Sequence, residues 1–111
     1  MRIAVSVLAI LFALLHIIAA ATQLRSKDPA ARGSAVLMLC GGVLLIVSAV
    51  AHLVNSGLGA QIEALSAGVC GFFPICFAAY LNGRRAGKVH VSHHLVRGGV
   101  AVLLVLGFFL W

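Results

Sequence analysis

Long apolar runs separated by short polar connections fill the whole chain. Four runs of 20 to 23 residues lie at 3–24, 34–54, 62–81 and 89–111. A bilayer core of about 30 Å requires about 20 apolar residues at the α-helical rise of about 1.5 Å per residue. The pattern therefore predicts an all-α polytopic membrane protein with four transmembrane helices in a compact bundle.

Composition agrees with this class of protein. Hydrophobic residues make up 63% of the 111 residues and charged residues 9%, which leaves too little polar surface for a water-soluble domain. The connections are too short to hold a second domain, so residues 1–111 are expected to form one transmembrane domain. Arg97, inside the fourth run, is expected to reach the membrane surface with its long side chain.

The cationic residues are divided unequally among the connections. Of the eight Lys and Arg residues, all but Arg2 lie in two segments, 25–33 and 82–97. Because cytoplasmic loops carry an excess of Lys and Arg, both segments are expected in the cytoplasm, with the two termini outside. The compact loops favour a bacterial plasma membrane. One-sided charge also predicts that any homo-oligomer is parallel.

A polar cluster marks the start of the fourth run, at positions i, i+3, i+4 and i+7 of one helix face: His90, His93, His94 and Arg97. Imidazoles at this spacing bind transition metals. With the nearby cations Arg84, Arg85 and Lys88, the same face also suits a phosphate or an anionic lipid headgroup. The third interpretation is a solvated face that anchors the helix among headgroups.

Three further side chains are expected at one depth inside the membrane. From the rise per residue, His16, Cys40 and Cys76 lie about 12, 9 and 8 Å from the cytoplasmic ends of their helices. Such donors suit copper or haem iron if their helix faces converge. The alternative is that His16 makes a hydrogen bond across helices to a hydroxyl or carbonyl group, and that both cysteines are apolar fillers.

On the opposite side of the membrane, His52 near the end of the second run and Glu63 near the start of the third are expected at similar depth. A pair of this kind can bind a proton or cation in the membrane. The alternative places Glu63 at headgroup level, stabilised by the dipole at a helix N-terminus.

Small residues recur where helices are expected to approach closely. The third run has Ala64, Gly68 and Gly71, the second has Gly41 and Gly42, and the fourth has the pair 98–99. Small residues allow close backbone contact in membrane helices. These positions predict contacts within the bundle or, alternatively, between protomers.

No nucleophile elbow, P-loop, HExxH motif or carboxylate pair is present, so no enzymatic chemistry is expected. The leading hypothesis is a self-associating or accessory membrane subunit without a cofactor. The alternatives are a proton- or cation-linked transporter or channel using Glu63 and His52, and a metal- or haem-binding protein using His16 and the histidine cluster. Expected partners are the bilayer with its anionic cytoplasmic lipids, and a parallel homo-oligomer or larger membrane complex. The loops explain the net charge of +6 without nucleic acid.

Overall fold

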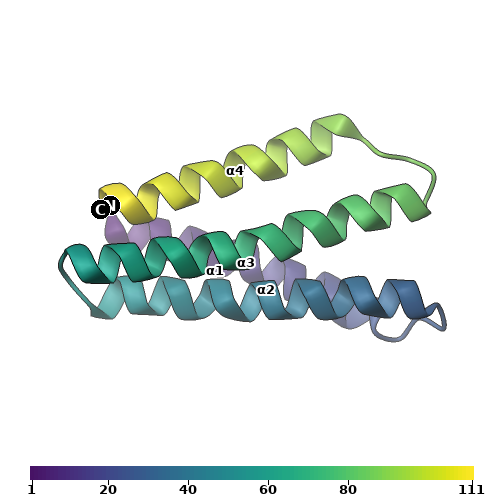
Figure 1. Ribbon diagram of the computed structural model, residues 1–111, viewed down its shortest axis with the longest axis horizontal. Coiled ribbons are helices and arrows are strands. Elements are labelled where there is room, and N and C mark those ends of the chain that lie inside the picture. Colours follow the sequence, from purple (N-terminus) through teal and green to yellow (C-terminus); the bar gives the residue numbers. More distant parts are fainter.

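The computed structural model describes all residues 1–111, and its regular structure consists of four α-helices. They are α1 (Arg2–Gln23), α2 (Pro29–Val54), α3 (Leu58–Arg85) and α4 (Val91–Leu110). Consecutive helices run in opposite directions (Figure 1). Each is long and apolar enough to cross a membrane, which confirms the predicted all-α chain with four helices of membrane-spanning length.

The two ends of the bundle differ in composition. Both chain termini lie at one end, together with the turn at 55–57 (Figure 1). We call this the terminal end. The connections 24–28 and 86–90 lie at the opposite end, which we call the basic end because the Lys and Arg residues other than Arg2 gather there.

The helices α2 and α3 begin four or five residues before their apolar runs, whereas α4 begins at Val91, two residues later than predicted. Asp28 caps α2 by accepting a hydrogen bond from the Ala30 backbone N–H at 3.0 Å, and Pro29 occupies the first turn. From this cap α2 continues unbroken to Val54. Gly57 precedes α3 with a φ of +108°, a conformation that favours glycine.

The helix α2 packs directly between α1 and α3 through glycines. A Cβ atom added at Gly41 would lie 2.5 Å from the backbone oxygen of Gly71, and one at Gly42 would lie 2.6 Å from the side chain of Ile17. The atom at Gly41 could not be accommodated without moving the helices, whereas the atom at Gly42 would displace the Ile17 side chain. The expected contacts of small residues within the bundle are therefore confirmed for α2 and α3. They are wrong for residues 98–99 of α4, where an added Cβ would meet no atom within 4 Å.

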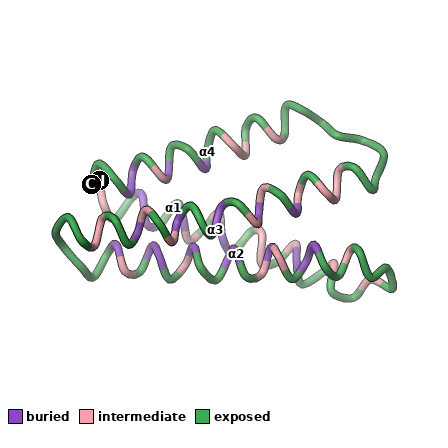
Figure 2. The backbone as a smooth tube through the Cα atoms, viewed as in Figure 1, coloured by how far each residue is buried: buried purple, intermediate pink, exposed green.

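The core is distributed unevenly along the bundle (Figure 2). The larger of two buried clusters joins all four helices and includes Leu45, Phe72 and Phe108, whereas the smaller cluster at the basic end includes Met38 but nothing from α4. The buried residues of α4 all follow position 100. The other half of α4 diverges from α3 towards the basic end (Figure 1).

Candidate functional site

The divergence of α4 opens a cleft of about 460 Å³ at the basic end, between α1, α3 and α4. Its polar lining comes from α1, α3, the connection 86–90 and α4: His16, Gln23, Asn82, Lys88, His90, His93, His94 and Arg97. No carboxylate lines it. The structure therefore places the whole predicted histidine cluster on one cationic cleft.

The three histidines of the cluster have different surroundings. His94 packs edge-on against Tyr80 of α3, with ring centroids 6.2 Å apart, and lies beside Gly83. His90 precedes the first turn of α4, and its ring lies 5.5 Å from that of His93. His93 also lines a second hollow between α1 and α4. It is thus the histidine of this cluster that faces α1.

His16 contributes an imidazole to the cleft from inside α1. Its Nδ1 donates a hydrogen bond to the backbone oxygen of Phe12 at 2.7 Å, and the two rings lie 4.3 Å apart. The expected hydrogen bond across helices is wrong, because the carbonyl one turn earlier in the same helix is within reach. Since a carbonyl accepts, Nδ1 carries the hydrogen.

The proposed metal layer is not assembled. Cys40 is exposed, because α2 buries the neighbouring positions Met38, Gly41 and Gly42 instead. Cys76 is half-buried and does not line the cleft. The chain holds no group of three or more His, Cys, Asp or Glu side chains arranged to bind a metal ion. Equal depth along the bundle did not bring these side chains onto facing sides of their helices.

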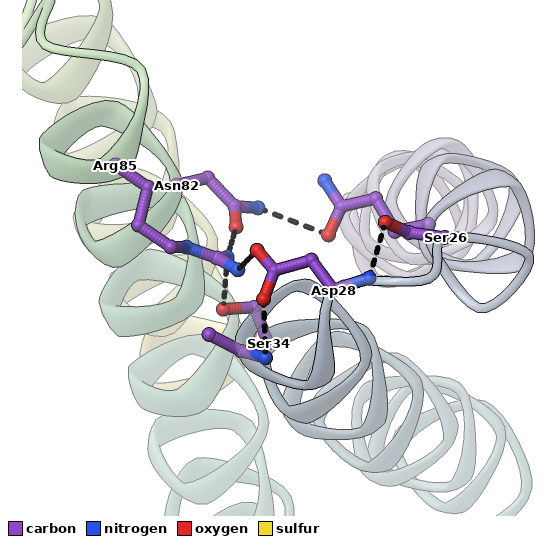
Figure 3. A network of polar contacts seen from close by, with 7 residues as sticks. Ser26, Asp28, Ser34, Asn82 and Arg85 are labelled. Carbon is purple, nitrogen blue, oxygen red and sulfur yellow. Dashed lines mark hydrogen bonds and ion pairs between the residues drawn. The ribbon is translucent and has the colours of Figure 1, made fainter.

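Arg85 is part of a polar network that joins three helices at the basic end (Figure 3). Its guanidinium pairs with the Asp28 carboxylate at 3.5 Å, donates to the Ser34 hydroxyl at 2.7 Å and also contacts the Asn82 side chain. Asn82 in turn donates to Gln23 of α1 at 3.1 Å. This network ties the end of α1 and the start of α2 to the end of α3.

The cations predicted to form one anion site are therefore divided. Arg85 is committed to the network, and Arg84 lies 6.0 Å from the ring centre of Tyr80 on the exposed surface. Lys88 and Arg97 line the cleft. The sequence analysis did not predict this network. The signal for it was Asp28, the single acidic residue among the cations of the basic end.

Glu63 and His52 do not form the expected pair. His52 is 1% exposed and lies against Phe108, with ring centroids 5.1 Å apart. Its Nε2 has no hydrogen-bond partner. Glu63 is exposed and has no cationic group within ion-pair distance, because the pair between Asp28 and Arg85 is the single salt bridge. The similar depth expected for His52 and Glu63 again did not predict which helix faces are in contact.

A second feature that sequence reasoning missed lies at the terminal end. The Arg2 guanidinium donates to the backbone oxygens of His52 and Asn55, which are free carbonyls at the end of α2. A positive charge at this position also complements the helix dipole. The sequence signal was the isolation of Arg2, the one cation at its end of the bundle. Nearby in α1, the hydroxyl of Ser6 is fully buried without a partner.

These features define a four-helix bundle of membrane-spanning proportions, with a cationic cleft where its fourth helix separates from the others. In comparisons with protein-family models, curated proteins and solved structures, no match to this chain was found.

Proposed function

We propose that this chain is an integral membrane protein that works by binding, without enzymatic chemistry, as a self-associating subunit or an accessory subunit of a larger membrane complex. In this proposal the basic end lies in the cytoplasm of a bacterial cell, and both termini lie outside the plasma membrane. The concentration of cations at one end of the bundle supports this orientation. It also means that assembled copies are parallel.

The observation that carries the proposal is the incomplete packing of α4. Residues 91–100 include no buried residue, yet His93 and Arg97 project into the cleft beside them. Polar side chains at membrane depth require a partner or a watery cavity. A cleft that gathers cations and imidazoles without a carboxylate suits binding of a negatively charged group.

Membrane insertion and orientation are tested by alkaline extraction and by labelling single cysteines. With the three native cysteines replaced by Ser, Ser56→Cys and Ala86→Cys introduce thiols at exposed positions of opposite ends. A membrane-impermeant maleimide should label Ser56→Cys in intact cells and Ala86→Cys after permeabilisation. The reverse pattern, or release of the protein at alkaline pH, would contradict the proposal.

The subunit role is tested by native mass spectrometry of protein extracted in lipid nanodiscs. A discrete homo-oligomer, or a stable complex with another polypeptide, supports it. If the protein were found only as a monomer, the subunit role would be excluded.

Proton-linked transport is the second candidate, favoured by the buried and unpartnered imidazole nitrogen of His52. Buried polar groups in membrane helices frequently belong to ion or proton pathways. In this proposal Glu63, which is exposed on α3, supplies the carboxylate at the entrance. Glu63→Gln should then abolish pH-dependent flux in proteoliposomes, and unchanged flux would exclude the idea.

A further inference from the structure

Two further hollows between α1 and α4 adjoin the cleft. Three hollows share lining residues: the cleft and a middle hollow share His16, His93 and Arg97, and the middle hollow shares Leu15 and Val100 with a third. The three hollows therefore adjoin one another along α1 and α4, and we call them together the α1–α4 groove. It begins at the basic end and follows α4 towards its packed half.

The groove changes from cationic to apolar along its length. Lys88 and Arg97 line the cleft together with the imidazoles, whereas every side chain that lines the third hollow is hydrophobic, including Leu8, Leu11 and Leu103. From Leu8 to Leu15 the apolar part follows α1 for about 10 Å, which is about two-thirds of the roughly 15 Å hydrocarbon thickness of one leaflet. A soluble anion would contact the cationic part alone.

The charge of the cleft is not neutralised by the protein itself. The chain has two acidic residues: Asp28 pairs with Arg85 outside the cleft, and Glu63 lies near the start of α3, at the other end of the bundle. Arg97 lines both the cleft and the middle hollow, where the lining changes from polar to apolar. A phosphate at this boundary would meet a guanidinium, which binds phosphate through two hydrogen bonds.

We propose that the α1–α4 groove binds one anionic phospholipid of the leaflet at the basic end, with its phosphate between Lys88 and Arg97 and an acyl chain along Leu11, Leu15 and Leu103. The charge complementarity of the cleft and the apolar lining beyond it select this occupant. The lipid would lie along the side of α4 that faces α1, from His93 in the half without buried residues to Leu103 in the packed half. The inference rests on the proposed membrane insertion and names the ligand of the proposed binding site.

The experiment measures retention of lipid by delipidated protein in a neutral detergent, by native mass spectrometry during titration with phosphatidylglycerol or phosphatidylcholine of the same acyl chains. We expect one phosphatidylglycerol per chain and weaker retention of phosphatidylcholine. Arg97→Gln should weaken phosphatidylglycerol binding about tenfold, the effect of losing a charged hydrogen bond. Arg84→Gln removes the same charge outside the cleft and should change little. Equal effects of the two variants would overturn the proposal.

A second pair of variants tests the acyl chain. Leu103→Trp fills the apolar hollow and should lower phosphatidylglycerol binding, whereas Leu106→Trp, at an exposed position that does not line it, should not. An excess of glycerol 3-phosphate should leave the lipid bound. Displacement by this soluble anion would identify a site for free phosphate esters instead.

The outcomes separate this inference from the proposed function. If the cysteine labels show insertion in the expected orientation but both lipids bind equally, the lipid site is wrong and the membrane assignment stands. If the protein does not insert, both fail. A second copy or another polypeptide crosslinked into the groove through Leu103→Cys would also overturn the lipid site. Because the comparison of two lipids uses the unaltered chain, misfolding of a variant does not remove the test.

Discussion

Gly107 of α4 lies against Val5 of α1 so closely that a Cβ atom added to the glycine would be 2.8 Å from a Val5 methyl carbon. This contact fixes the end of α4 that carries its buried residues. Near the middle of α4, a Cβ atom added at Gly98 or Gly99 would meet no atom within 4 Å. The fourth helix is thus packed into the core in its second half and has no buried residue in its first.

The contact between Gly107 and Val5 predicts a compensating pair of substitutions. Gly107→Ala should lower the free energy of unfolding by about 1–3 kcal/mol, because the added methyl group overfills the contact. Val5→Ala should restore part of the loss in the double variant. Titration of the detergent-solubilised protein with sodium dodecyl sulfate measures the free energy of unfolding of the single and double variants. Gly99→Ala is the control, and an equal loss there would show that the effect is not due to this contact.

The approach of α2 to α3 predicts a larger loss at Gly41. In Gly41→Ala the new methyl group would face the Gly71 carbonyl oxygen at 2.5 Å, and a backbone atom cannot rotate away as a side chain can. We expect Gly41→Ala to destabilise the bundle more than Gly107→Ala in the same titration. The reverse order would contradict the close approach of these two helices.

Asp28 has two roles that substitutions can separate. As the cap of α2 it accepts from the Ala30 N–H, and as a charge it pairs with Arg85. Asp28→Asn keeps the cap and loses the charge. It should lower the free energy of unfolding by less than about 1 kcal/mol, because the ion pair with Arg85 is partly exposed. Asp28→Ala loses both the cap and the charge and should lower the free energy of unfolding by about 1 kcal/mol more. Equal stabilities of the two variants would show that the cap contributes nothing.

The two adjacent arginines of α3 predict unequal effects on stability. Arg85→Gln removes the contacts with Asp28 and Ser34 and should lower the free energy of unfolding by about 1 kcal/mol. Arg84→Gln removes an exposed charge above a tyrosine ring and should change it by less than about 0.5 kcal/mol. High salt should narrow the difference, since ions screen the Asp28 pair. Equal losses would argue against the network.

The sequence predicted the helices well because their length and apolarity respond to one physical constraint. A backbone inside a bilayer must satisfy its own hydrogen bonds, so each long apolar run is helical. The close approach at Gly41 also followed, because glycines in such runs permit close contact. The length of each helix and the position of its glycines along the helix axis could therefore be predicted from the sequence.

The candidate site was predicted in part, because its geometry depends on rotation about the helix axes. The spacing of His90, His93 and His94 predicted one face of one helix; His90 lies just before α4 instead, but all three line one cleft. Depth alone grouped His16 with Cys40, and His52 with Glu63, but these side chains belong to different faces of the packed helices. The separation of α4 depends on how the buried residues are distributed over all four helices. The sequence of one apolar run does not show this distribution.

The one-sided packing of α4 has a mechanical consequence. The packed half of α4 begins at Ala101, so the part of the helix that can swing carries His93. A bend of roughly 10° near Ala101 would move His93 by about 2 Å over the roughly 12 Å of helix between them. Small changes at the packed end would therefore widen or narrow the cleft considerably. Such a cleft would discriminate between occupants by their charge more than by their size.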